Sequence, residues 1–198
     1  MKKNSGLIFV ISGPSGSGKT TLLSKLINSP GLKQALKKSI SFTTRPRRSK
    51  ERNGRDYYFI TEQQFRDRLR KKKILEWTKY LGYYYATPSG IVDKCIKDGK
   101  NIALCLDKKG AFKLKKLYPG TITIFVMPPS LVSLRQRIRG RCNKTSNKEI
   151  SGRLRLAEKE MMIAKKYDFC IINKDLEQAS REATGIISRL ITLNNILK

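Results

Sequence analysis

The sequence contains no histidine, few acidic residues and no long apolar run. Its cysteines form no C-x-x-C pair and show no zinc-ligand spacing; they are Cys95, Cys105, Cys142 and Cys170. This pattern predicts no zinc site and is typical of reduced thiols in a cytoplasmic protein. No segment approaches the roughly 20 apolar residues that a membrane-spanning helix needs, so we expect no membrane partner.

Acidic residues number 15 against 43 lysines and arginines, which gives a formal net charge of +28. Such a balance favours binding to polyanions. The basic residues are spread along the whole chain, however, and no zinc-finger, KH or RRM signature organises them. We therefore expect no specific nucleic-acid partner, and interpret the charge as a basic surface together with a site for several phosphates.

The 198 residues suit one compact domain or a core with a small insert. The first residues, "MKKNSGLIFVIS", combine a basic start with a short apolar run, as a signal peptide does. They lead into a glycine-rich loop instead of a small-residue cleavage site. We interpret Leu7–Ile11 as a buried first strand.

Short β-rich runs alternate with helical patterns along most of the chain, which predicts an α/β fold with a mainly parallel sheet. The predicted strands are Leu7–Ile11, Asn101–Leu106, Thr121–Val126 and Phe169–Ile172. The predicted helices are about Gly18–Asn28, Lys108–Leu117, Ser130–Arg139, Glu149–Lys166 and Leu176 onward. Ser130 is the expected N-cap of the third of these helices.

Residues 39–87 depart from this pattern. Short strand-like segments rich in Tyr, Thr and Phe surround one helix, which opens with the capping box Thr61-x-x-Gln64. They predict a small α+β insert in a core made of residues 1–38 and 88–198. A second irregular stretch, Gly140–Glu149, separates two arginine-bearing helices, and we expect a lid at about residues 137–155.

A glycine-rich motif follows the first strand. It matches G-x-x-x-x-G-K-[ST] in full, as Gly13, Pro14, Ser15, Gly16, Ser17, Gly18, Lys19 and Thr20. Its glycines let backbone N–H groups converge on phosphate oxygens, and the following helix adds its positive N-terminal end. Lys19 is expected to reach the β- and γ-phosphates, and Thr20 to ligate Mg²⁺. The motif therefore predicts a nucleoside triphosphate site, with Mg²⁺ as cofactor.

The rest of the sequence does not favour a regulatory GTPase, although such proteins also contain this motif. Such a protein needs a guanine-reading N-K-x-D, and "NKDL" at Asn173–Leu176 lacks the final Asp. No D-x-x-G accompanies it. We therefore do not expect the protein to hydrolyse the γ-phosphate as part of a GTPase switch.

The insert carries residues suited to a second, phosphorylated substrate. "SFTTRPRRSKERNGRDYYF" contains Arg45, Arg48 and Tyr57, and "EWTKYLGYYYAT" contains Glu76 and Tyr85. Arginines supply bidentate contacts to a phosphate dianion, and phenols supply neutral donors. Guanine presents N1–H and N2–H₂ donors side by side, which one carboxylate can accept and adenine cannot offer. Glu76 is the candidate for that contact.

Several motifs together resemble the guanylate kinase family, whose members make GDP from GMP with ATP. They are "GPSGSGKT", "S-x-TTR-x-x-R…E-x-x-G-x-DYYF", "EW-x(7)-YY-x-T", "LD-x-x-G", "PPS-x-x-x-L-x-x-R-x-x-GR" and "YDF-x-IIN". The resemblance covers nearly the whole chain. It implies a P-loop nucleoside monophosphate kinase-like fold, with a parallel-sheet core, a GMP-binding insert and a lid.

The resemblance also implies a role for individual residues. Guanine would contact Ser41, Glu76, Thr87 and Asp107. The GMP phosphate would be held by Arg45, Arg48, Tyr57 and Tyr85. The lid arginines that approach the transferring group would be Arg141 and Arg153, and the base end of ATP would lie near Arg137 and Asn173. The implied catalytic residues are Lys19, Arg45, Arg141 and Arg153.

The sequence departs from the family pattern at a few positions. Cys105 stands where the family usually has an acidic residue two places before Asp107, and Lys50 stands where glycine is common. The family's "ND" reads Asn173-Lys174 here. The segment between Arg141 and Arg153 is slightly longer than usual, which leaves the register of the lid open.

Simpler interpretations remain open at this point. Tyr57 and Tyr85 could be sheet-face aromatics, Arg137 or Arg153 a solvated helix face, and Asp107 only a helix N-cap. A guanylate-kinase-like protein-binding module is the rival function, but such modules typically lose the glycine and lysine of the loop. Oligomeric state and use of dGMP also stay open.

Overall fold

The core is a parallel sheet in the computed structural model, which describes residues 5–141 and 146–196. Its strand order is β2-β7-β1-β8-β9, and every pairing is parallel. The strands are β1 (Ile8–Ser12), β2 (Leu36–Lys38), β7 (Asn101–Cys105), β8 (Ile122–Met127) and β9 (Phe169–Ile172). The predicted α/β fold with a parallel-sheet core is confirmed.

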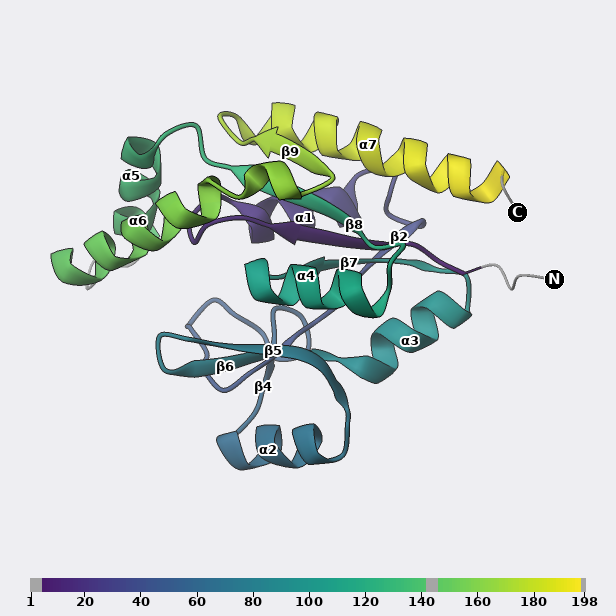
Figure 1. Cartoon of the computed structure of the whole chain (residues 1–198), viewed down its shortest axis with the longest axis horizontal. Coiled ribbons are helices and arrows are strands. Elements are labelled where there is room, and N and C mark those ends of the chain that lie inside the picture. Colours follow the sequence, from purple (N-terminus) through teal and green to yellow (C-terminus); the bar gives the residue numbers. More distant parts are fainter. Residues whose placement is uncertain (1–4, 142–145, 197–198) are drawn as a thin grey trace.

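Helices cover both faces of this sheet (Figure 1). On one face lie α1 (Lys19–Asn28) and α7 (Leu176–Ile196), and on the other α3 (Ser89–Lys97) and α4 (Lys108–Leu117). Successive residues of β1 face opposite sides, so Phe9 packs with α1 and α7 while Val10 packs with α3 and α4. Because both faces are covered, β1 is apolar without alternation, as the sequence shows.

The insert forms a separate sheet beside α4 (Figure 1). Its order is β4-β3-β6-β5, with strands β3 (Phe42–Thr43), β4 (Tyr58–Phe59), β5 (Ile74–Tyr80) and β6 (Tyr83–Pro88). Helix α2 (Glu62–Arg70) opens with the predicted capping box, in which Thr61 and Gln64 exchange two hydrogen bonds of 3.1 Å. Two separate sheets support the division at residues 39–87, which we propose as the domain boundary.

The hairpin between β5 and β6 turns at Leu81 and Gly82, which have φ angles of 49° and 85°. Two consecutive positive φ values are typical of a type I′ turn, where Asn-Gly is the favoured pair. A leucine rarely adopts this left-handed conformation. Leu81 is half exposed and lies at the rim of the cavity described below.

Helices α5 (Leu131–Arg141) and α6 (Asn147–Met161) pack together at one end of the core (Figure 1). Ser130 caps α5 as predicted, because its Oγ accepts from the backbone N–H of Ser133 at 3.1 Å. The predicted irregular stretch Gly140–Glu149 is wrong in its described parts, since residues 140–141 and 147–149 are helical.

The predicted helix Glu149–Lys166 is also corrected, because it consists of two pieces. Helix α6 ends at Met161, and a 3-10 turn (η1, Ala164–Lys166) leads to β9. Burial of Ala164 and Tyr167 against the α3 and α4 face of the sheet draws the chain inward at this turn.

Two elements are absent from the sequence-based prediction. Strand β2 has three residues, two of them lysines, and gives no apolar run. Helix α3 follows Pro88 and has no side-chain cap at its start. Within the described ranges, none of the helices is long and apolar enough to cross a membrane.

Candidate functional site

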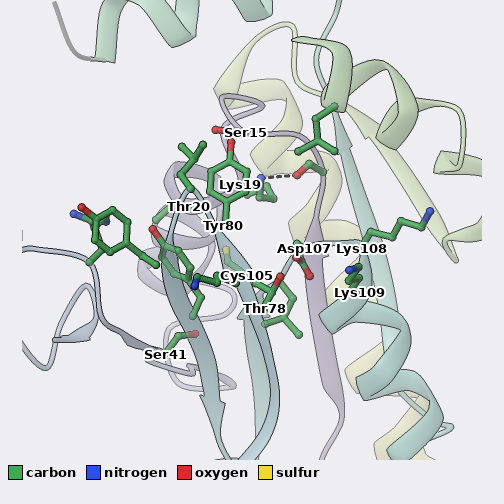
Figure 2. A pocket seen from close by; sticks show the side chains of 18 of the residues that line it. Ser15, Lys19, Thr20, Ser41, Thr78, Tyr80, Cys105, Asp107, Lys108 and Lys109 are labelled. Carbon is green, nitrogen blue, oxygen red and sulfur yellow. Dashed lines mark hydrogen bonds between the residues drawn. The ribbon is translucent and has the colours of Figure 1, made fainter. Parts of the chain in front are cut away.

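A cavity of about 1110 Å³ lies where the glycine-rich loop, the insert, the start of α4 and helix α6 meet. Figure 2 shows side chains from these elements around it, among them Lys19 from the loop and helix, Ser41 from the insert and Asp107 from the start of α4. Parallel strands β1 and β7 end here, so their carboxyl ends deliver the loop and Asp107 to one edge of the sheet. The cavity therefore joins the two groups of residues that the sequence singled out.

The glycine-rich loop has a backbone that side chains would obstruct. Gly13, Gly16 and Gly18 have φ angles of 139°, 93° and 96°. A Cβ at Gly13 would lie 2.4 Å from the carbonyl oxygen of Val126. The positive φ angles favour glycine at all three positions. At Gly13 the neighbouring strand β8 also leaves no room for a side chain.

Lys19 and Thr20 begin α1 at the cavity wall. The Lys19 ammonium donates to the carbonyl oxygens of Gly13 and Pro14, at 2.6 and 2.8 Å. Its own loop thus holds the lysine over the helix N-terminus. The exposed hydroxyl of Thr20 lies in the same first turn.

Asn173 lies behind this loop. It is buried, and its Nδ2 donates to the carbonyl oxygen of Ser17 at 2.7 Å. Arg137 in turn donates to the backbone oxygen of Asn173 at 2.9 Å. Neither residue lines the cavity. Asn173 instead connects the end of β9 to the glycine-rich loop through its hydrogen bond to Ser17. Their contact with ATP stays a prediction.

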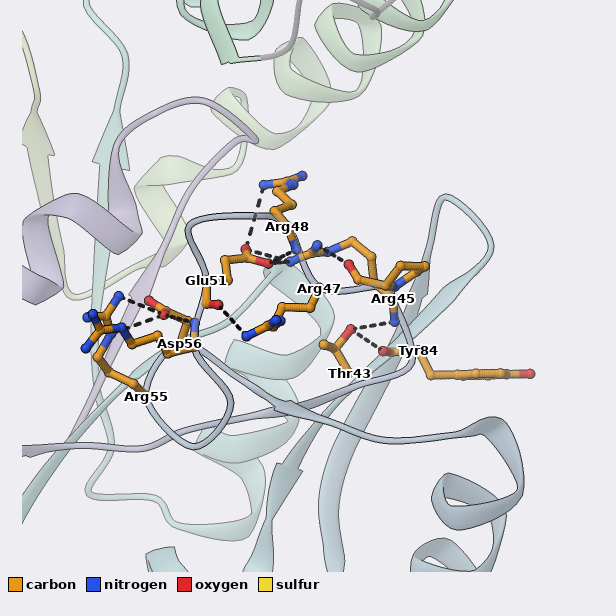
Figure 3. A network of polar contacts seen from close by, with 10 residues as sticks. Thr43, Arg45, Arg47, Arg48, Glu51, Arg55, Asp56 and Tyr84 are labelled. Atoms are coloured by element: carbon orange, nitrogen blue, oxygen red, sulfur yellow. Dashed lines mark hydrogen bonds and ion pairs between the residues drawn. The ribbon is translucent and has the colours of Figure 1, made fainter.

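In the insert, Arg45 belongs to a charged network whose contacts converge on Glu51 (Figure 3). Its Nη2 donates to both carboxylate oxygens of Glu51, at 2.7 and 2.9 Å, and the backbone N–H of Arg48 donates to the same carboxylate at 2.9 Å. Burial alone would lower the pKa of Arg45, but its contacts with Glu51 raise it above its ordinary value. The guanidinium therefore stays charged and oriented.

Glu51 is a site residue to which the sequence analysis gave no role, although it lies in the quoted stretch. The available sequence signal was an acidic residue six places after Arg45, in a stretch rich in arginine. It lines the cavity together with Arg45 and Arg48.

Tyr57 and Tyr85 face each other across the insert, with ring centroids 5.9 Å apart. The Arg45 guanidinium lies 5.7 Å from the centre of the Tyr57 ring, and both tyrosines line the cavity. Burial raises the pKa of Tyr57 to about 12, so its hydroxyl stays protonated and able to donate. Tyr85 is thus a strand residue of β6 that also lines the cavity, while Tyr57 lines it from the position just before β4.

Glu76 is a buried carboxylate, 3% exposed, on β5. The Thr87 hydroxyl donates to its Oε1 from the neighbouring strand β6. Burial raises its pKa to about 7, against the effect of the Thr87 hydrogen bond and with a further rise from the Asp107 charge. An acid this far from its ordinary pKa in a cavity is a candidate for ligand recognition.

Asp107 is a helix N-cap that also lies in the cavity wall, and its contact with guanine stays a prediction. Its Oδ1 accepts from the backbone N–H of Gly110 at 2.8 Å, which makes it the N-cap of α4. It also lines the cavity, as Ser41 does. The residue two places before it, Cys105, lies on the same wall, where burial raises its thiol pKa to about 11. The thiol is therefore neutral at pH 7.

Arg153 extends from α6 toward the glycine-rich loop. Its Nη2 donates to Glu149 at 2.6 Å and its Nη1 to the Ser15 hydroxyl at 3.4 Å. The side chain is 17% exposed, so the interpretation as a solvated helix face is wrong. Glu160, which sequence reasoning missed, also lines the cavity from α6. The side chain of Arg141 lies outside the described residues.

Comparison with known proteins gives a consistent result. The family model described as guanylate kinase matches residues 5–190. The guanylate kinase of Caldanaerobacter subterraneus subsp. tengcongensis is 39% identical over 185 residues, which cover 93% of this chain and 88% of the relative. That of Clostridium acetobutylicum is 40% identical over 182 residues, covering 92% of this chain and 85% of the relative.

A solved structure agrees with these sequence matches. The crystal structure of guanylate kinase from Anaplasma phagocytophilum superposes with a TM-score of 0.74 at 30% identity. The match covers 93% of this chain and 86% of that one. Sequence and fold thus agree over almost the full length, and the chain belongs to the guanylate kinase family.

Proposed function

We propose that this protein, a nucleoside monophosphate kinase by family, transfers the γ-phosphoryl group of ATP to GMP, giving ADP and GDP. The observation that carries the proposal is the single cavity shared by the glycine-rich loop and the charged wall of the insert. A donor and an acceptor bound on its two sides would meet inside it. The three described cysteines are free thiols, which supports a cytoplasmic location.

The donor half is the glycine-rich loop. Its backbone amides and the N-terminal end of α1 would bind the phosphates of ATP, and Lys19 would leave the carbonyls of Gly13 and Pro14 to reach them. The Thr20 hydroxyl, a hard oxygen at the cavity wall, fits Mg²⁺ held mainly by phosphate oxygens and water. When bound, Mg²⁺ would neutralise charge on the β- and γ-phosphates.

The acceptor half is the insert. Arg45, Arg48, Tyr57 and Tyr85 line the cavity where a phosphate dianion would be held. Glu76 would accept from the N1–H and N2–H₂ edge of guanine, with Asp107 beside it. Ser41 would contact the same base from the cavity wall, whereas Thr87 is fully buried behind the wall and would act by holding Glu76.

No general base is needed, because the attacking group is a phosphate oxygen that is already anionic. The protein would act by placing that oxygen in line and by stabilising charge on the transferring group with Lys19, Arg45 and Arg153. The Arg153 contact with Ser15 shows that α6 can reach the loop. Closure of α5 and α6 over ATP would exclude water and suppress hydrolysis.

The test is ADP release with and without acceptor, followed for GMP, IMP and AMP. We expect release that depends on GMP, an intermediate rate with IMP, which lacks the amino group, and neglect of AMP by about 10⁴-fold. Glu76→Gln should lose most GMP activity, because an amide offers one acceptor and adds a donor facing guanine's own. Binding of GMP without turnover would favour the protein-binding module instead.

A further inference from the structure

Gly110, in the first turn of α4, lies beside Glu76 and Asp107, the two carboxylates proposed to contact guanine. Its backbone N–H donates to Asp107 Oδ1 at 2.8 Å. On its other side, the position of its absent side chain faces Glu76. This residue therefore lies at the junction between the insert, which carries Glu76, and the core, which carries Asp107.

Glycine is required at position 110 because of the neighbouring Glu76 side chain, not because of the backbone conformation. Gly110 is helical and is not among the residues with positive φ, so alanine would suit its conformation. A Cβ there would lie 2.6 Å from Glu76 Oε2, which is shorter than real contacts allow, and 3.1 Å from Glu76 Cδ, which is tighter than most. To restore ordinary contact, the carboxylate would have to move by about 1 Å, a displacement that can cost on the order of 100-fold in a positioned site.

Glu76 is restrained on the sides that do not face the cavity. It is 3% exposed, and its Oε1 accepts from Thr87 on the adjacent strand. Oε2 lies in space that a Cβ at residue 110 would take, 2.6 Å from where that atom would be. The Thr87 hydrogen bond and the space left by Gly110 together let the carboxylate present its acceptors where it does.

We infer that Gly110 is a positioning residue that determines nucleobase selectivity, by letting the Glu76 carboxylate lie against α4 beside Asp107. The inference rests on the proposed function, in which these two acids read the amino edge of guanine. It predicts that a single methyl group at residue 110 weakens recognition of GMP while leaving the ATP half intact.

The first test is calorimetric binding of GMP, IMP and AMP, with turnover measured alongside. Gly110→Ala should lower kcat/KM for GMP by about 100-fold, weaken GMP binding and reduce the GMP-to-AMP affinity ratio, with KM for ATP unchanged. The matched control is Gly185→Ala in α7, where nothing lies within 4 Å of the added Cβ. It should leave every constant unchanged.

The second test is thermal unfolding in a double-mutant cycle with Glu76→Ala. Gly110→Ala should lower Tm in the wild-type background, because it displaces Glu76. It should raise Tm in the Glu76→Ala background, where the helix preference for alanine outweighs the remaining contact with Leu106 Cβ, at 3.3 Å. The same sign in both backgrounds would overturn the steric argument.

The two failures are distinguishable. Equal losses for GMP, IMP and AMP, or an unchanged affinity ratio, would overturn the selectivity role even if the unfolding cycle shows coupling. Selective GMP binding without turnover in the wild type would overturn the proposed function, and the affinity ratio of Gly110→Ala would still decide the inference.

Discussion

Burying Glu76 without a counter-ion has a cost that should be visible in the unliganded protein. The carboxyl has a pKa of about 7 in the folded chain against an ordinary value of 4.5, chiefly because burial disfavours the charged form. The folded state therefore holds its proton more tightly than the unfolded state does. Stability from this group is complete below pH 4.5 and is lost as pH rises through 7.

Replacing Glu76 with Gln removes the titration while keeping the size of the side chain. The shift from 4.5 to about 7 corresponds to about 3 kcal/mol. Relative to wild type, the Gln variant should gain stability progressively from pH 5 to pH 8, by about 2 to 3 kcal/mol. Above pH 8 the difference should be constant.

The assay is urea unfolding of both proteins at half-unit steps from pH 5 to pH 8.5. The exposed Glu182→Gln in α7 is the control, and it should change stability by no more than about 0.5 kcal/mol at any pH. A difference between wild type and Glu76→Gln that does not vary with pH would refute the buried, uncompensated carboxylate. Because guanine donors favour the carboxylate, GMP binding should also release a proton near pH 7 and tighten as pH rises.

Other substitutions test separate parts of the site. Lys19→Ala should keep the fold and cost roughly 3 kcal/mol or more of transition-state stabilisation, measured as kcat/KM. Near-wild-type turnover would contradict the assignment of the loop as the ATP site. Cys105→Asp should leave the Mg²⁺ requirement of turnover unchanged or reduce it, since the neutral thiol is a poor partner for Mg²⁺ or its waters; a higher requirement would contradict this. Leu81→Asn should raise the free energy of unfolding by about 0.5 to 1 kcal/mol, by relieving the positive φ of the hairpin turn, and an unchanged urea midpoint would argue against strain there.

The core and the glycine-rich loop were predictable because several local signals agree there. Buried strands such as β1 are apolar throughout, and the loop motif lies between a strand and a helix, where its function requires it. The capping box of α2 was likewise visible, since both of its partners lie within four residues.

What sequence reasoning missed depends on contacts between distant residues. Strand β2 exists because an edge position beside β7 was available to it, and its own residues give no strand signal. Asn173 reaches Ser17 across 156 positions, and Gly110 matters because of Glu76, which arrives from the insert. Pairings of this kind arise from topology, so no local pattern reports them.

The contact between Asn173 and the loop implies that adjacent motif positions are constrained by different physical requirements. A Cβ at Gly18 would lie 2.3 Å from Asn173 Nδ2, so this glycine is constrained by packing whether or not a nucleotide ever binds. Lys19 is held by hydrogen bonds to the carbonyl oxygens of Gly13 and Pro14, and replacing it with a smaller residue would remove these bonds without creating a clash. In a lineage that lost catalysis but kept this fold, Lys19 should drift first, and Gly18 should change only together with Asn173.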